Sequence, residues 1–202
     1  MRNTTLLVAA CAALALAACS IGKPVPPANM YIVEPAPPAS AAGARRADVM
    51  RMGIVRVAAP FAGSALVYRV DAVQYVADPY EMFIAEPAGM LGSRMAEWLD
   101  RAGPFKSVAQ PGSAQPASYV LEATVTELYG DFRAGTPPAA VMSVQFALVD
   151  LSGARARPVF GRTISRRTDI AKASPDALVR GYGTALSEIL AELSAGLQAS
   201  TQ

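Results

Sequence analysis

Serine, threonine and carboxylate side chains are the groups in this chain that could act as nucleophiles, general bases or metal ligands. The 202 residues contain no histidine, which removes the usual general base and the commonest ligand of transition metals. A serine nucleophile would then need a lysine base, and the chain has only three lysines, Lys23, Lys106 and Lys172. The 16 acidic residues form no cluster with metal-ligand spacing, and no glycine-rich loop has phosphate-binding spacing. We therefore expect a protein that is not an enzyme and that has no metal and no dissociable cofactor.

The two cysteines are the remaining reactive side chains, and Cys19 follows a signal-like segment. Arg2 supplies a positive charge, and Leu6 to Ala18 is apolar or small throughout but too short to span a bilayer. This pattern predicts a cleaved signal peptide over residues 1–18. The sequence Leu16-Ala17-Ala18-Cys19 resembles the bacterial lipobox. The resemblance implies a diacylglycerol on the Cys19 thiol and an N-acyl chain, such as palmitate, on its amine.

Acylation at Cys19 would anchor the mature protein to a membrane, and the residue after it indicates which membrane. Several acyl chains, each contributing about 0.8 kcal/mol per buried methylene, would keep the protein on a membrane almost permanently. Cys11 would leave with the signal peptide, so no thiol would remain for a disulfide or for redox chemistry. Ser20 follows Cys19, and in Gram-negative lipoproteins a serine there permits export, whereas an aspartate commonly signals retention in the inner membrane. The resemblance therefore implies the periplasmic face of the outer membrane.

Residues 19–47 are predicted to be a tether between the acylated cysteine and the folded domain. They are rich in proline and alanine, and proline-rich chain favours an extended conformation. The apolar stretch Met30 to Val33 interrupts this composition and suits an edge strand added to the domain's sheet. The net charge of +2 and the absence of a Lys/Arg-rich run argue against nucleic-acid binding.

Residues 48–199 are predicted to form a single α+β domain in which a mainly antiparallel sheet packs against two helices. The first helix begins at Glu86-Pro87 and ends before Gly103-Pro104, and the second begins with Ser174 as its N-cap. Leucines at helical spacing give the second helix a continuous apolar stripe. Alternating or β-branched runs predict strands at residues 53–58, 65–70, 73–76, 105–108, 119–126, 142–150 and 159–168.

The aromatic residues between positions 68 and 83 are the candidate partner contacts. Tyr68, Arg69 and Phe83 are the predicted contacts, because aromatic rings and arginine are enriched at protein interfaces. Packing in the core or within a hairpin is the alternative interpretation of the same stripe. The loop Gly130 to Ala139 is a further candidate, because long exposed loops often carry recognition.

A series of segments connects the chain to a known family. The lipobox and proline-rich tether are followed by Tyr31-Ile32-Val33, Ile54 to Pro60, Leu66 to Asp71, Tyr80 to Pro87, and Met90 to Val108. In order and spacing, this series resembles the ABC-type transport auxiliary lipoproteins, which include the lipoprotein of the paraquat-inducible system. The resemblance covers roughly residues 30–197. It implies a partner assembly of an MCE-domain protein, an ABC permease and an ATPase that moves lipids or other hydrophobic molecules between membranes. Since some members form rings, it also makes a homo-oligomer an expectation.

Three other functions remain open from the residues alone. The domain could be an assembly or scaffold lipoprotein of another envelope system, such as lipopolysaccharide assembly or a TolB-like protein, because such small α+β domains look alike in sequence. It could instead carry a lipid in its own cavity. An envelope enzyme is the remaining alternative and would need a carboxylate or serine mechanism.

Overall fold

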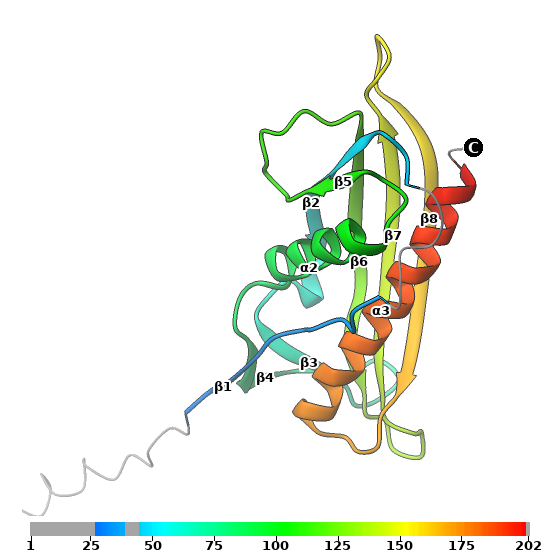
Figure 1. Cartoon of the computed structure of the whole chain (residues 1–202). Coiled ribbons are helices and arrows are strands. Elements are labelled where there is room, and N and C mark those ends of the chain that lie inside the picture. Colours follow the sequence, from blue (N-terminus) through cyan, green and yellow to red (C-terminus); the bar gives the residue numbers. More distant parts are fainter. Residues whose placement is uncertain (1–26, 39–44, 201–202) are drawn as a thin grey trace, which may run out of the picture.

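The structure is a computed structural model that describes residues 27–38 and 45–200. Its strands and helices follow one another in the order shown in Figure 1. They are β1 (Asn29–Tyr31), β2 (Val49–Val57), the short 3-10 helix η2 (Ala59–Phe61), β3 (Ala65–Arg69), β4 (Tyr75–Phe83), α2 (Pro87–Ala102), β5 (Ser107–Ala109), β6 (Tyr119–Asp131), β7 (Ala139–Asp150), β8 (Arg157–Asp169) and α3 (Pro175–Ser200).

Strand β6 organises the mixed sheet of eight strands. Along one edge it pairs antiparallel with β7, which in turn pairs antiparallel with β8 over nearly its whole length. Two strands share the other edge of β6: β2 runs parallel to its first half, and β3 meets only its last two residues, Gly130 and Asp131. Strand β5 extends the sheet beyond β2, whereas β4 and then β1 extend it beyond β3. The sheet is therefore continuous on one side of β6 and divided on the other.

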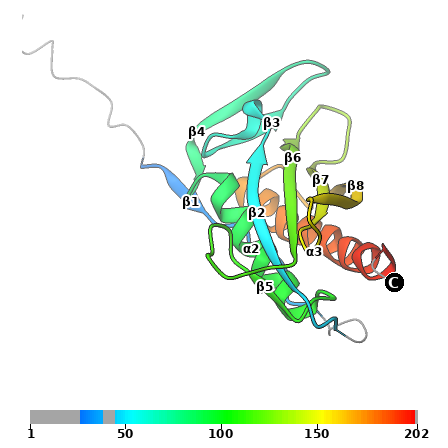
Figure 2. The same cartoon turned by 90° about the horizontal axis from the view of Figure 1, so that it is seen from above.

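Both helices cover the same face of this sheet, as Figures 1 and 2 show. Helix α2 packs on β2 and β5, and α3 packs on β7 and β8. The apolar stripes predicted for the two helices are buried against the alternating apolar residues of β6 and β7, as expected for a half-covered sheet. The Ser194 hydroxyl donates to the Ala102 carbonyl oxygen at 3.2 Å and links the helices. The sheet's opposite face, which we call the open face, is more polar and carries Glu122, Thr124 and Gln145.

The chain before the predicted domain boundary is part of the fold. Strand β1 pairs parallel with the end of β4, and the Tyr31 hydroxyl donates to Glu81 Oε2 at 2.6 Å. Beyond β1, the segment passes between α2 and α3 in Figure 1. There the Trp98 indole donates to the Ala36 carbonyl oxygen at 3.0 Å, and the Ala36 amide donates to the Ser187 hydroxyl at 2.7 Å. The folded unit thus includes residues 29–37, which the sequence assigned to the tether.

The predicted fold class is confirmed: one α+β domain, two helices on one face and long antiparallel ladders. Helix α2 starts and stops where predicted, and the Ser174 hydroxyl caps α3 by accepting from the Ala177 amide at 3.4 Å. The edge strand expected within residues 30–33 is β1. None of the helices in the described ranges is long and apolar enough to cross a membrane. The signal peptide at 1–18 and the acylation of Cys19 lie outside the described residues and stay predictions.

Candidate interaction surface

The three predicted partner residues lie on β3 and β4, in different environments. Tyr68 is half-buried, its ring stacks on Phe132 with centroids 5.0 Å apart, and its hydroxyl donates to Asp78 Oδ2 at 3.2 Å. Burial and the neighbouring Asp78 carboxylate raise the pKa of Tyr68. Its hydroxyl therefore stays protonated, and its ring fastens β3 to the chain that follows β6.

Arg69 lies on the open face beside a tyrosine ring. Its guanidinium donates to the carbonyl oxygens of Asp71 at 3.3 Å and Ala72 at 2.6 Å, which holds the β3–β4 turn. The guanidinium carbon also lies 5.8 Å from the ring centroid of Tyr75, its partner across the hairpin. This is the geometry of a cation–π contact, and it leaves a positive charge at the surface.

Phe83 belongs to the core. Its side chain is only 4% exposed, and its ring lies 6.2 Å from that of the fully buried Tyr182 on α3. The core alternative that the sequence left open therefore describes Phe83, whereas Tyr68 and Arg69 keep atoms at the surface. Whether either of them contacts a partner stays a prediction.

An aromatic cluster on the open face supports the β3–β4 hairpin near its turn. The Phe61 ring, from η2, stacks on Tyr129 of β6 with centroids 5.8 Å apart. The Tyr75 ring meets Tyr129 edge-on at 5.3 Å and Phe61 at 6.2 Å. Phe61 and Tyr129 are buried, but Tyr75 is 44% exposed. Sequence reasoning missed Phe61 and Tyr129, because the parallel pairing of β3 with β6 that brings them together leaves no local signal.

The hairpin presents apolar side chains to solvent around Tyr75. Val73, in the turn, is 90% exposed, and Val70 and Val76 are exposed on either side of it. In Figure 2 this hairpin extends away from the sheet on the side opposite α3. Exposed apolar side chains grouped with an aromatic ring and an arginine are typical of protein interfaces. We call Arg69, Val70, Val73 and Tyr75 the hairpin surface.

A buried carboxylate fixes the loop next to this surface. Asp131 is 1% exposed and accepts two hydrogen bonds from Arg133 at 2.8 Å and one from Arg167 at 2.6 Å. These hydrogen bonds, chiefly those from Arg133, lower the pKa of Asp131 to about 2 despite its burial. Arg167 also donates to the Pro137 carbonyl oxygen at 2.7 Å. The predicted recognition loop is thereby pinned beside the hairpin.

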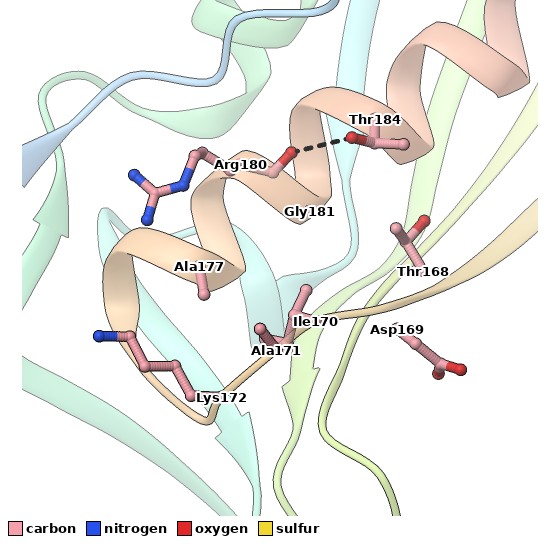
Figure 3. Close-up of a pocket in the computed structure, with 9 residues that line it drawn as sticks. All are labelled: Thr168, Asp169, Ile170, Ala171, Lys172, Ala177, Arg180, Gly181 and Thr184. Atoms are coloured by element: carbon pink, nitrogen blue, oxygen red, sulfur yellow. Dashed lines mark hydrogen bonds between the residues drawn. The ribbon is translucent and has the colours of Figure 1, made fainter.

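A separate hollow of about 370 Å³ lies between the end of β8 and the first turns of α3. Figure 3 shows Ile170, Ala171, Ala177 and Gly181 at its centre. The charged ends of Lys172 and Arg180 extend to one side, and the Asp169 carboxylate extends to the other. The charged groups therefore do not converge on a common ligand position.

No metal-binding group was found in the part of the chain that the structure describes: no three Asp, Glu, His or Cys residues are grouped there to hold an ion. Each buried side-chain nitrogen or oxygen of that part also has a hydrogen-bond partner. The predicted acyl chains on Cys19 lie beyond the described residues.

Comparison with known proteins finds one matching family model and solved structures with the same fold. The family model described as "ABC-type transport auxiliary lipoprotein component" matches residues 31–194. No protein of curated function matches the chain. A crystal structure of a Xanthomonas campestris protein of the DUF330 family superposes with a TM-score of 0.74 at 17% identity, covering 87% of this chain and all of the other. An uncharacterized protein superposes with a TM-score of 0.62 at 16% identity, covering 85% of this chain and 99% of its own. These TM-scores show a shared fold.

Proposed function

Since this chain belongs to the family of ABC-type transport auxiliary lipoprotein components, we propose that it is a lipid-anchored accessory subunit that docks with an MCE-domain protein, an ABC permease and an ATPase. The assembly would move lipids or other hydrophobic molecules between membranes. The chain would be anchored through Cys19 on the periplasmic face of the outer membrane. Its own contribution would be binding, because ATP hydrolysis would belong to the partner.

The hairpin surface is the observation that carries the docking proposal. Leaving Val73 almost fully exposed in a turn gains nothing for the isolated domain, whereas burying it against a partner would remove apolar area from water at about 25 cal/mol per Å². The hydrogen bonds from Arg69 to the turn carbonyls and the ring cluster around Tyr75 hold this surface in one arrangement. A surface fixed before binding loses little conformational entropy when a partner docks.

The anchor would keep the domain close to its membrane. Since β1 begins at Asn29, at most about 36 Å of extended chain, at 3.3–3.6 Å per residue, separates it from Cys19. A tether reaching to residue 47 would allow almost three times that span. The docking partner would therefore have to approach the anchored membrane to reach the domain.

Recovery of partners from the envelope in mild detergent tests this function. We expect the wild-type lipoprotein to bring down an MCE-domain protein together with permease or ATPase. Val73→Asp should reduce that recovery about tenfold, since it places a charge at the centre of an apolar contact. Leu151→Asp is the matched control: Leu151 is also exposed but lies in the β7–β8 turn, at the far end of the sheet.

Two results would contradict the proposal. Equal recovery with Val73→Asp and Leu151→Asp would remove the hairpin surface from the docking site. Recovery of a β-barrel protein without any MCE-domain protein would instead favour an assembly lipoprotein of another envelope system. Circular dichroism of both variants should match the wild type, because each replaced side chain is exposed.

A further inference from the structure

The outer edge of β2 is open for most of its length. On its inner edge β2 pairs with β6 from Met50 to Val57, but on its outer edge β5 pairs only with Val49, Met50 and Arg51. Within residues 27–38 and 45–200, no strand pairs with that outer edge from Met52 to Val57. Exposed edges of this kind are templates for an added strand.

Ile54 stands at the middle of this open edge and is 74% exposed. Edges protected against pairing usually carry charge at such a position. The ladder to β6 shifts register between Met52 and Val55, and Gly53 approaches β6 so closely that an added Cβ would lie 3.1 Å from the Leu121 carbonyl oxygen. The bulge therefore presents Ile54 outward while keeping the strand against β6.

Two hollows flank the edge, and Ile54 borders both. The turn that follows β5 also borders both, with Gln110 and Pro111 in one hollow and Gly112 and Ser113 in the other. A hollow of about 670 Å³ lies on the helix side, between β2 and the first turns of α2, and is lined there by the small residues Ala88, Gly89 and Ser93 and by Glu97. A second hollow of about 320 Å³ lies on the open face and is lined by Arg51, Arg56 and Glu122 among others. Side chains of an extended segment alternate between the two faces, so a strand that runs along β2 past this turn would find space for both sets.

The charges around the second hollow indicate what such a strand would carry. Neither Arg51 nor Arg56 has an ion pair or side-chain hydrogen bond in the described portion of the chain, and Glu122 is the one carboxylate that lines this hollow. The hollow therefore has an excess of positive charge that an acidic side chain would complement. A second copy of β2 would instead bring further arginines, because Val49–Val57 contains no acidic residue.

We propose that the outer edge of β2 binds an extended, acidic segment of a partner protein by strand addition. Backbone hydrogen bonds along Met52–Val57 would supply affinity. Small apolar side chains would enter the α2 hollow, and carboxylates would face Arg51 and Arg56. This site is separate from the hairpin surface and does not depend on the proposed transport role.

Synthetic peptides test the site on the full chain in mild detergent. The probes are a capped seven-residue peptide alternating glutamate and valine, and the same peptide with lysine in place of glutamate. We expect the glutamate peptide to bind about tenfold more tightly than the lysine peptide and to slow amide hydrogen exchange in Met52–Val57.

Variants of the protein test the same site from the other side. The double variant Arg51→Glu/Arg56→Glu should reverse the preference between the two peptides. Ile54→Asp should weaken binding of the glutamate peptide, whereas Ile84→Asp, at another exposed isoleucine, should not.

Equal affinity for the two peptides, or exchange protection elsewhere than β2, would overturn the proposal. A second measurement avoids the peptides altogether. A photoreactive residue at position 54 of the anchored protein should crosslink to an extended acidic segment of another protein. Crosslinks between two copies of this chain at position 54 would show that the edge serves self-association instead, and would also overturn it. Position 151 is the control position for the crosslink.

Discussion

At the scale of single residues, Asp131 makes an electrostatic contribution that pH can reveal. Its pKa is lowered from 3.8 to about 2, so it favours the folded state once it is ionised, above about pH 4. That contribution is lost as the pH falls toward 2. A shift of this size corresponds to about 2 kcal/mol. We expect Asp131→Asn to lower the free energy of unfolding by about that amount at pH 7, measured by urea denaturation.

Repeating the urea titration between pH 5 and pH 2 separates the electrostatic contribution of Asp131 to stability from its contribution through packing. The difference between wild type and Asp131→Asn should shrink through this range as the wild-type carboxylate becomes protonated. Asp169→Asn is the matched control, because Asp169 faces the same Arg167 at 3.9 Å but is mostly exposed; surface pairs of this kind contribute little. A difference independent of pH would show that Asp131 acts through packing.

Phe83 is a residue whose environment could not be predicted from the sequence. The sequence groups Phe83 with Tyr68 and Arg69 as candidate partner contacts, because all three belong to one aromatic-rich stretch between positions 68 and 83. The β3–β4 ladder shifts register between Ala65, which pairs with Met82, and Val67, which pairs with Ala77. Across this bulge the alternation that assigns residues to faces breaks down. Phe83 therefore turns into the core although Tyr75 and Tyr80 are exposed, and no local pattern in the sequence shows it.

At the scale of elements, the segment after β1 depends on Gly183 in α3. A Cβ added at Gly183 would clash with the Glu34 carbonyl oxygen, and that backbone would have to move. We expect Gly183→Ala to release residues 33–37 and so break the Trp98–Ala36 and Arg94–Glu34 contacts. The emission of Trp98, the single tryptophan, should then shift to the red. Proteolysis within the released segment should accelerate.

A second helical glycine provides the control for this substitution. A Cβ added at Gly89 in α2 would meet nothing within 4 Å. Gly89→Ala should therefore leave the Trp98 emission unchanged and raise stability by up to about 1 kcal/mol through helix propensity. If Gly183→Ala also left the Trp98 emission unchanged, residues 33–37 would not pack against α3 as they do in this structure.

Elements with strong local signals were predictable, and those set by distant pairing were not. Glu86-Pro87, Gly103-Pro104 and Ser174-Pro175 bounded the helices because prolines and caps act within one turn. Alternation predicted β6, β7 and β8 because each has one covered face. In contrast, the sequence did not reveal that β2 lies parallel to β6, or that residues 33–37 cross two helices. These contacts join segments far apart in the chain.

At the scale of the whole molecule, β2 and β3 share one edge of β6, and this divides the domain into two groups of strands. One group is held to the sheet by far fewer backbone pairings than the other. Strands β1, β3 and β4, which we call the hairpin lobe, join the rest of the sheet through only two residue pairs between β3 and β6. Strands β6, β7 and β8 are paired along nearly their full lengths and are backed by α3. The lobe that carries the hairpin surface is therefore the part with the fewest backbone hydrogen bonds to the core.

This arrangement predicts that the hairpin lobe opens before the rest of the domain. We expect amides of β3 and β4 to exchange at least about tenfold faster than those of β7 under native conditions, because local opening breaks fewer contacts there. Phe132→Ala removes the ring stacked on Tyr68 and should accelerate exchange in the lobe alone. Phe160→Ala, a partly buried ring on β8 that contacts α3 near Gly196, should instead affect β8 and α3. Uniform exchange across β3, β4 and β7 would mean that the sheet opens as one unit, and docking at the hairpin would then stabilise the whole domain rather than its lobe.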